Sequence, residues 1–483
     1  LSDSTIVDVS SGATYQLGDN ETIAGLKGVG SVALNAKTLT VNQAESTESR
    51  FSGSISGVPR GSRLVKSGAG NLILAGSNDI RSSITIEEGT LAASVAGALT
   101  DETDVIVDSA GVFSVLADNS IERLSGSGSV TLDSSAVLSA RSTSDTIFSG
   151  VISGNGSFEK LGPEVLTLTG ENTYLNGTRV NGGTLLVGST GSLNQDAKVF
   201  VGSAGKYQLQ SDASVGSIEG SGSIELGAST LTVGNDNTNQ IFSGVISGAG
   251  NFVKVGSGTL SLSGANTFTG SVQMNGGTIE ASVANVFGGS DLFILDGGTL
   301  RSISNGATDP TDVFQLGSNG GTFEVVGGIE SELKGPIQDE TTGQAGSLAK
   351  IGEGELVLRG ENTYTGSTTI GAGTLAVSGS LADSSTVDVK TGIYRLLSGD
   401  TIGELKGEGS VDLNGNELVI NQSESSESIF SGVISGAQVG SGLRKVGNGK
   451  VTLEGNNTFS GAIFADQGVL SISGVSNNVS NID

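Results

Sequence analysis

The sequence of 483 residues contains no cysteine, no histidine and no tryptophan, and only four prolines. Without cysteine it forms no disulfide and offers no thiolate. Without histidine it lacks Ser-His-Asp and Cys-His catalytic groups and every zinc site that needs histidine. The 24 basic residues face 50 acidic ones, a formal net charge of −26, which disfavours contact with nucleic acid or an anionic membrane surface. No run approaches the ~18 apolar residues of a membrane-spanning helix, so we expect no direct membrane insertion.

Glycine, in contrast, is abundant, with 78 residues, yet neither a Gly-x-y period nor proline enrichment indicates collagen. With 15 Phe and 5 Tyr, the core must consist mainly of Val, Ile, Leu and Ala. Stretches such as 165–169 (Val-Leu-Thr-Leu-Thr) and 259–263 (Thr-Leu-Ser-Leu-Ser) largely alternate apolar with small polar residues. This alternation predicts β-strands with one buried face, separated by turns rich in Gly, Asn, Ser and Asp.

One 26-residue segment recurs five times. Each copy begins at a lysine, passes through an alternating stretch and a turn resembling Gly-x-Asn-Thr-aromatic, and ends in Gly-Thr-Leu or a close variant. The copies are 66–91, 160–185, 254–279, 350–375 and 445–470, with lysines 94, 94, 96 and 95 residues apart. A Phe-Ser-Gly-x-Ile-Ser-Gly block precedes four of them, at 51–57, 148–154, 242–248 and 430–436. The repeating unit is therefore about 95 residues long.

Short strands that return at fixed spacing, without a break in composition, favour a solenoid over a sandwich or a closed barrel. We expect each strand to pair with its equivalent one coil onward. A unit would then hold about four coils of ~24 residues, and the whole chain about 20 coils. We predict a single all-β domain over residues 1–483. Its five units are 1–95, 96–189, 190–283, 284–379 and 380–473, followed by a short tail, 474–483.

The pattern Lys-x-Gly-x-Gly-x-Leu-x-Leu-x-Gly-x-Asn-Thr-(Phe/Tyr)-x-Gly, followed by Gly-Gly-Thr-Leu, resembles the autotransporter-associated β-strand repeat. That repeat occurs in passenger domains of Gram-negative type V secretion proteins. The first copy departs from it at Asn78-Asp79-Ile80, and the fifth ends in Gly468-Val469-Leu470. The resemblance implies a right-handed parallel β-helix that is exported through the periplasm and outer membrane, to the cell surface or beyond. The family's translocator barrel is not expected in this fragment, which would be passenger only.

The repeated lysines allow two interpretations, a basic ladder and a structural role. Charges ~19 Å apart along the axis lie beyond a Debye length of roughly 8–10 Å, so we favour the structural role, in which each stem covers apolar surface beside a corner. The turn asparagines are expected to bond turn backbone. These structural positions are Lys66, Lys160, Lys254, Lys350 and Lys445, and Asn172, Asn266, Asn362 and Asn457.

Extra residues interrupt the first, fourth and fifth repeats between the Phe-Ser-Gly block, or its counterpart, and the lysine. Insertions in a solenoid form loops off one face, often the binding face, although neutral decoration is the alternative. A further irregular stretch, 303–310, lies in the fourth repeat. The candidate protein-contact residues are Pro59, Arg60, Arg63, Asp309, Pro310, Asp339, Glu340, Gln344 and Gln438.

The resulting hypothesis is a passenger that contacts a host cell-surface or matrix protein, as an adhesin and virulence factor. The alternatives are a released ligand or toxin acting on a host receptor, and self-association of bacteria. Carboxylates are scattered, and neither a Gly-Asp-Ser-Gly segment nor a Gly-x-Ser-x-Gly elbow occurs. We therefore expect no enzymatic activity, no catalytic or metal-binding residue, no cofactor and no nucleic-acid partner.

Overall fold

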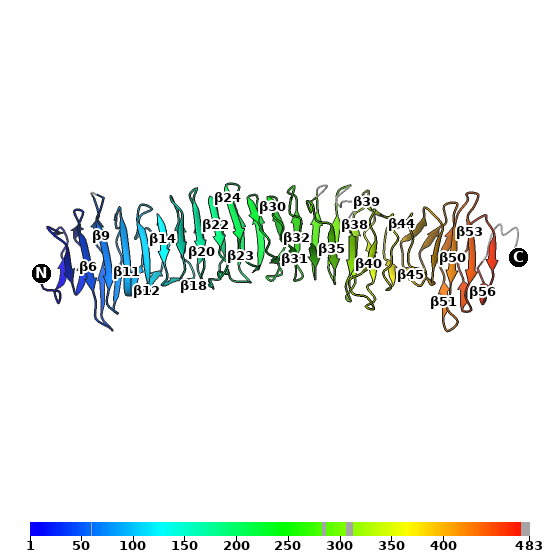
Figure 1. The fold of residues 1–483 in the computed structure, drawn as a ribbon, viewed down its shortest axis with the longest axis horizontal. Coiled ribbons are helices and arrows are strands. Elements are labelled where there is room, and N and C mark those ends of the chain that lie inside the picture. Colours follow the sequence, from blue (N-terminus) through cyan, green and yellow to red (C-terminus); the bar gives the residue numbers. More distant parts are fainter. Residues whose placement is uncertain (59, 283–285, 306–312, 475–483) are drawn as a thin grey trace. The chain divides into compact units, whose positions relative to one another are not determined.

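The computed structural model describes residues 1–58, 60–282, 286–305 and 313–474. Within these residues the regular structure is entirely β, and it forms a right-handed parallel β-solenoid of about 23 turns. Figure 1 shows the short strands following one another along the chain. The predicted fold class is confirmed. None of the described residues belongs to a helix long and apolar enough to cross a membrane.

The chain divides into two compact units, which are described separately. Unit 1 comprises Leu1–Asp236 and Gly244–Ser247, and unit 2 comprises Asn237–Ser243 and Gly248–Asp483. The division of a single domain into five units of about 95 residues stays a prediction.

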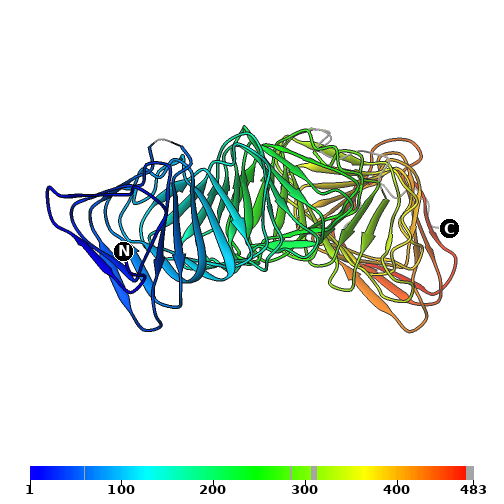
Figure 2. The ribbon, with the colours of Figure 1, turned by 60° about the vertical axis from the view of Figure 1, so that its left-hand side comes forward.

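Unit 1 contains an 18-stranded parallel sheet, and Figure 2 shows its turns winding around a common axis. The strands of this sheet are β1 (Ile6–Val9), β3 (Glu21–Ile23), β4 (Gly25–Gly28), β6 (Thr38–Asn42), β7 (Glu48–Phe51), β9 (Arg63–Ser67), β10 (Asn71–Leu74), β11 (Ser83–Ala93), β12 (Asp104–Val115), β14 (Arg123–Gly126), β15 (Ser129–Leu132), β17 (Thr146–Phe148), β18 (Val151–Gly154), β20 (Val165–Leu168), β22 (Gly183–Val187), β24 (Gly205–Leu209), β27 (Ser223–Glu225) and β30 (Val245–Ser247). The other strands of unit 1 are β2 (Thr14–Gln16), β5 (Ser31–Ala33), β8 (Ser54–Ser56), β13 (Asn119–Ile121), β16 (Val137–Ala140), β19 (Ser157–Lys160), β21 (Thr178–Val180), β23 (Lys198–Val201), β25 (Ala213–Val215), β26 (Ser217–Gly220) and β28 (Leu231–Val233).

Unit 2 is built in the same way from short parallel strands on successive faces. One series is β29 (Gln240–Phe242), β32 (Thr259–Leu262), β34 (Thr278–Ala281), β36 (Thr299–Ser302), β38 (Gly321–Val325), β41 (Leu348–Ile351), β43 (Thr368–Ile370), β45 (Thr386–Val389), β48 (Glu404–Gly407), β51 (Glu427–Phe430), β54 (Lys450–Leu453) and β56 (Val469–Ile472). The remaining strands are β31 (Phe252–Lys254), β33 (Val272–Met274), β35 (Leu292–Leu295), β37 (Val313–Leu316), β39 (Glu330–Leu333), β40 (Ile337–Asp339), β42 (Glu355–Leu358), β44 (Thr374–Val377), β46 (Ile393–Leu396), β47 (Asp400–Ile402), β49 (Ser410–Asp412), β50 (Glu417–Asn421), β52 (Val433–Ser435), β53 (Gly442–Val446) and β55 (Ile463–Ala465).

The period-two pattern of the sequence sets which side chains enter the core. In β20, Leu166 and Leu168 are buried, whereas Val165 and Thr167 are half-buried on the outer face. Strand β20 pairs in parallel with β22, which places Leu166 beside Leu185 of the next turn. Because identical faces stack in this way from turn to turn, the narrow core is filled by columns of aliphatic side chains.

The turns are shorter than we expected, and the register of unit 1 shows the reason. Following the strand pairings from Lys66 leads through Ile86, Val107 and Gly126 to Phe148, so that one turn takes 19 to 22 residues. The expected ~24 residues per coil was too high because the corners are tight and the strands, apart from β11 and β12, hold only three to five residues. The chain therefore makes about 23 turns rather than about 20.

A repeat consequently spans a non-integral number of turns. Four turns lead from Lys66 to Phe148, and Lys160, the equivalent of Lys66, lies 12 residues further along the next turn. Lys66 belongs to β9 of the 18-stranded sheet, whereas Lys160 belongs to β19, which pairs with β16 and β21 on another face. Each strand pairs with the strand one turn onward, as expected, but consecutive repeats place equivalent residues on different faces.

Glycines of the Phe-Ser-Gly blocks form a close backbone contact between turns. A Cβ built on Gly150 would lie 1.7 Å from the carbonyl oxygen of Gly128, and one built on Gly170 would lie 1.9 Å from that of Gly150. Neither contact leaves room for a side chain, so glycine is required here by close approach rather than by a left-handed conformation. This explains why the motif keeps glycine after the buried Phe148.

Candidate functional site

The turn asparagines lie inside the solenoid and join neighbouring turns. The Oδ1 atom of Asn172 accepts a hydrogen bond from the amide of Ile152 at 3.0 Å, and its Nδ2 donates to the carbonyls of Gly170 and Ser192 at 2.8 and 3.0 Å. One buried amide thus satisfies three backbone groups at a corner where regular strand pairing is interrupted. The same role is seen in Asn362, with Ile337, Gly360 and Ser380; in Asn457, with Ile434 and Gly455; and in Asn266, which donates to Val286.

Two further asparagines extend this set, Asn78 in the first unit and Asn119 in the second. Asn78, where the sequence departs from the motif, accepts from the Ile55 amide at 3.0 Å and donates to Gly76 and Ala98. Asn119 accepts from the Leu99 amide at 2.9 Å and donates to the carbonyls of Val95 and Ala117. Sequence reasoning missed Asn119 because it lies outside the 26-residue segment.

The repeated lysines are buried, which differs from the predicted stem covering an apolar surface. The Nζ atom of Lys160 donates to the carbonyls of Leu161, Gly162 and Gly182 at 2.5, 3.0 and 3.2 Å. The Nζ atoms of the other four lysines also donate to backbone carbonyls. The acceptors are those of Ser67, Gly68 and Glu88 for Lys66; Val255 and Gly256 for Lys254; Ile351, Gly352 and Ala372 for Lys350; and Val446, Gly447 and Gln467 for Lys445. Each ammonium closes the glycine turn of its repeat.

Burial also changes the acidity of these groups. It lowers the pKa of Lys66, Lys160 and Lys350 from 10.5 to about 8, against a smaller upward effect of nearby glutamates. Burial lowers the pKa of Lys445 as well. With pKa values of about 8, Lys66, Lys160 and Lys350 are largely charged at pH 7 and are held by carbonyl dipoles. All five repeated lysines are buried, so they present no basic surface.

The predicted contact residues fall into three groups. Arg60, Arg63, Glu340, Gln344 and Gln438 are exposed, as a contact surface requires. Asp339 instead holds its loop in place, since its carboxylate accepts bonds from the Gly346 amide at 2.8 Å and from the Thr365 hydroxyl at 2.7 Å. Pro59, Asp309 and Pro310 lie outside the described residues. The role of all nine candidate residues in binding stays a prediction.

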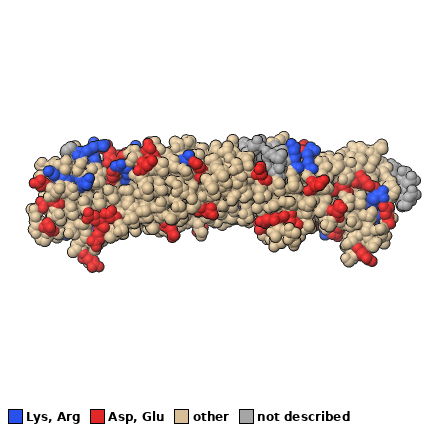
Figure 3. Space-filling view, in the orientation of Figure 1, with Lys and Arg blue, Asp and Glu red and all other residues tan. Residues whose placement is uncertain are grey.

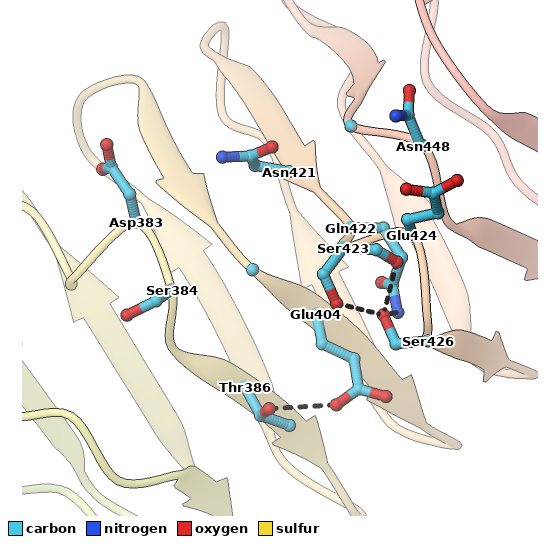
Figure 4. Close-up of a pocket in the computed structure, with 12 residues that line it drawn as sticks. Asp383, Ser384, Thr386, Glu404, Asn421, Gln422, Ser423, Glu424, Ser426 and Asn448 are labelled. Atoms are coloured by element: carbon cyan, nitrogen blue, oxygen red, sulfur yellow. Dashed lines mark hydrogen bonds between the residues drawn. The ribbon is translucent and has the colours of Figure 1, made fainter.

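A polar groove of about 490 Å³ opens at one corner of unit 2 (Figure 4). Four successive corners contribute to it, namely those before β45 and β48, between β50 and β51, and between β53 and β54. In Figure 4, Asp383 and Glu424 lie on opposite sides of the groove and Glu404 lies between them. The lining residues are Asp383, Ser384, Thr386, Gly403, Glu404, Asn421, Gln422, Ser423, Glu424, Ser426, Gly447 and Asn448.

Hydrogen bonds among the lining residues fix the shape of the groove. The Thr386 hydroxyl donates to Glu404 at 2.9 Å. The buried Gln422 donates to the Ser426 hydroxyl at 2.7 Å, which also lies 2.9 Å from the Ser423 hydroxyl. Three lining residues are acidic and none is basic, so the groove suits a partner that offers hydrogen-bond donors or positive charge. The sequence alone does not distinguish these residues, because a run of Ser and Glu also suits a solvated corner.

The visible surface of each unit carries more carboxylates than basic groups (Figure 3), in line with the net charge of −26. Many of the basic residues are paired across turns. Arg395, for instance, contacts Glu355 and Asp412, both at 3.1 Å. No group of three or more Asp or Glu is placed to hold a metal ion in the described part of the chain.

Comparison with known proteins finds one family model and two curated relatives, all of them connected with autotransporters. The model of the passenger-associated-transport-repeat matches residues 64–93, 158–187, 252–281, 348–377 and 443–472, which are the five segments found by internal comparison. The adhesin BmaC autotransporter of Brucella suis biovar 1 is 31% identical over 385 residues, which cover 73% of this chain and 11% of that protein. The probable autotransporter YfaL of Escherichia coli K12 is 33% identical over 135 residues, which cover 25% of this chain and 11% of that protein. No solved structure matches.

The chain thus spans about a ninth of the length of the curated relatives that it matches. The repeats and these relatives indicate export through the outer membrane to the cell surface or the extracellular space. Together with the parallel β-solenoid, they identify the chain as an autotransporter passenger segment that carries five passenger-associated transport repeats.

Proposed function

We propose that this segment acts as the contact-making part of an adhesin and binds a host cell-surface or matrix protein. The observation that carries the proposal is the similarity to a protein named as an adhesin, which extends over 73% of the chain. The fold supports it, since the buried lysines and asparagines are used within the solenoid and the exposed loops remain available for contact. The scattered carboxylates support a non-enzymatic role.

Two surfaces are proposed for the contact. One is the polar groove of unit 2, with Asp383, Glu404 and Glu424, which suits a donor-rich or cationic segment of a protein. The other comprises the insertion loops, with Arg60 and Arg63 in unit 1 and Glu340, Gln344 and Gln438 in unit 2. Pro59, Asp309, Pro310 and Asp339 belong to the same proposed set.

Binding of the whole chain to immobilised fibronectin, laminin and collagen, and to cultured epithelial cells, tests the proposal. We expect saturable binding at micromolar concentration or below. A Glu404→Ala, Glu424→Ala double variant should weaken binding at least tenfold, as expected from the loss of two close charge pairs. Glu361→Ala, an exposed carboxylate outside the groove, is the matched control. Absence of binding to every surface would contradict an adhesive role.

The two alternatives give different results in the same experiments. A released ligand or toxin would produce a cell response to the free chain, and self-association would produce dimers in sedimentation together with salt-sensitive clumping.

A further inference from the structure

Residues 21–66 and 400–445 are two copies of one scaffold, which align without a gap. The first copy lies in unit 1 and the second copy lies in unit 2. The side chains that are buried in the first copy recur at the equivalent positions of the second, with Ile420 in place of Val41. The differences are therefore concentrated on the outer surface, where they change what each copy offers to a partner.

The two copies differ in charge. Residues 21–66 include six basic and three acidic residues, whereas residues 400–445 include three basic and seven acidic ones. Figure 3 shows basic side chains gathered on the part of unit 1 that holds β6 and β9. In a chain with a net charge of −26, this part of unit 1 is the exception.

The insertion loop of the first copy presents two of these basic groups. Arg60 and Arg63 are exposed, and neither has an ion-pair partner in the described part of the chain. Lys37 and Arg81, on the preceding and following turns, are in contrast paired with carboxylates at 3.6 and 3.0 Å. The two arginines are thus available to an external anionic group.

Both copies anchor the insertion loop in the same way, but only the first copy has the charges. The Ser62 hydroxyl accepts a hydrogen bond from the Ala36 amide at 2.9 Å. The equivalent Ser441 hydroxyl accepts one from the Gly415 amide at 3.0 Å. The residues that replace the two arginines in the second copy are Val439 and Gly442. The scaffold therefore forms its loop without them.

The polar groove of unit 2 has the opposite charge. Asp383 and Glu424 are exposed on its two sides, and neither has an ion-pair partner among the described residues (Figure 4). Glu404 lies between them, 3.6 Å from the Lys406 ammonium. The first copy has Gly25 at the position of Glu404, so its equivalent corner lacks the central carboxylate. The loop charges belong to one unit and the complete groove to the other.

The spacing of the arginines matches that of the two unpaired carboxylates. The corners of Asp383 and Glu424 are two turns apart, because β45 pairs with β48 and β48 pairs with β51. Two turns correspond to about 9.6 Å along the axis. Arg60 and Arg63 are three residues apart, and three residues of chain span up to about 10 Å. Each guanidinium can therefore meet one carboxylate in a bidentate pair.

We propose that the loop carrying Arg60 and Arg63 in one copy of this chain docks into the polar groove of a second copy. An exposed basic loop and an acidic groove are complementary in charge. The net charge of −26 opposes association at long range, but screening at physiological salt limits this repulsion to about 8 Å, so that local pairs decide. Because loop and groove are different surfaces, each pair of copies keeps one loop and one groove free, and further copies can add. The contact goes beyond host binding, since it joins passengers to one another.

Sedimentation equilibrium of the purified chain tests the contact and involves no host protein, so its result is independent of adhesion. The mass should rise with concentration beyond that of two copies. Raising the salt from about 0.1 M to about 1 M shortens the Debye length from about 10 to about 3 Å and should return the chain to monomers. A monomer at every concentration in low salt would overturn the proposal.

Two double variants each remove one side of the contact. Arg60→Val with Arg63→Gly gives the loop the residues of the second copy, on which the same scaffold folds. Asp383→Asn with Glu424→Gln removes the unpaired charges of the groove. Each variant alone should be monomeric. An equal mixture should form dimers and nothing larger, because one variant supplies the groove and the other supplies the loop.

Arg50→Ile is the matched control, since Arg50 is an exposed arginine of the first copy outside the loop and the second copy has isoleucine there. It should associate like the unchanged chain. The proposal is overturned if either double variant also associates like the unchanged chain, or if their mixture stays monomeric.

Discussion

Replacing Lys160 by methionine tests whether the buried ammonium holds the repeat turn together. Methionine keeps an unbranched apolar stem of similar length and removes the three N–H donors. The carbonyls of Leu161, Gly162 and Gly182 then lose a partner at a half-buried corner, where water replaces it only in part. The substitution therefore isolates the carbonyl contacts from the packing of the stem.

The carbonyls that lose their donor decide the size of the loss. Each of the three carbonyls costs about 1 kcal/mol when its partner is removed, because water replaces the ammonium only in part. Lys160→Met is therefore expected to destabilise the turn by about 3 kcal/mol, or about 100-fold in its opening equilibrium.

Because each turn of a solenoid contacts only its neighbours, the loss should be local. Hydrogen exchange of the full chain should show about 100-fold lower protection in β19 and β20, with little change in β1 and β4. Lys206→Met is the control, since Lys206 is half-exposed and bonds Glu225 at 2.8 Å, a surface pair expected to contribute about 0–1 kcal/mol. Equal effects of the two substitutions would refute a stabilising role for the carbonyl contacts.

Three other corners give paired predictions, each measured as a change in denaturation midpoint or in local exchange of the full chain. Tyr207→Phe should stabilise the fold by about 1 kcal/mol, because the Tyr207 hydroxyl is buried without a hydrogen-bond partner among the described residues. Tyr394→Phe should instead destabilise the fold by about 1–2 kcal/mol, because the bond to Asp400 is lost. Stability changes of the same sign in the two variants would contradict this prediction. Gly150→Ala should destabilise the fold by about 3 kcal/mol or more, because its Cβ would lie 1.7 Å from the Gly128 carbonyl oxygen. Gly18→Ala, whose Cβ would have no atom within 4 Å, should be neutral or stabilise the fold by about 0.4–1 kcal/mol. A tolerated Gly150→Ala would show that the turns can move apart. Asn172→Ala should destabilise by about 3 kcal/mol through three lost backbone bonds. The half-buried Asn194, which donates one bond to the Thr173 carbonyl, should lose less than about 1 kcal/mol on replacement by alanine, and equal effects would rule out the bridging role.

The sequence was sufficient to predict the class of fold and the positions of the repeats. When the alternation of apolar and polar residues seen in β20 recurs every few residues, it indicates short strands that each bury one face. The recurring Lys and Asn mark corners whose backbone groups need the same hydrogen-bond partners in each repeat. The number of residues per turn was not predictable, because it depends on corner geometry. Gly150 approaches Gly128 closely, for example, and nothing in the local sequence reports a contact between residues 22 positions apart.

The candidate site was predicted only in part, for a related reason. An exposed residue and a residue that anchors its own loop look alike in a sequence, as Gln344 and Asp339 show. The groove of unit 2 was not recognised because its walls come from four corners that become neighbours only through the register of the turns. Such a site is a property of the stacking and has no contiguous motif.

The non-integral number of turns per repeat has a consequence for how this passenger segment makes contacts. If a repeat held four whole turns, equivalent loops would stand in a row on one face and would offer a partner several identical contacts. With Lys66 and Lys160 on different faces, equivalent loops of consecutive repeats point in different directions, so a flat partner surface meets at most one of the two. If this segment binds a partner, contacts on one face would then come from features peculiar to single repeats, such as the groove of unit 2, rather than from a motif shared by consecutive repeats. A variant that alters one groove should therefore lose most of the affinity for its partner, whereas a repeated binding motif would lose only one contact among several.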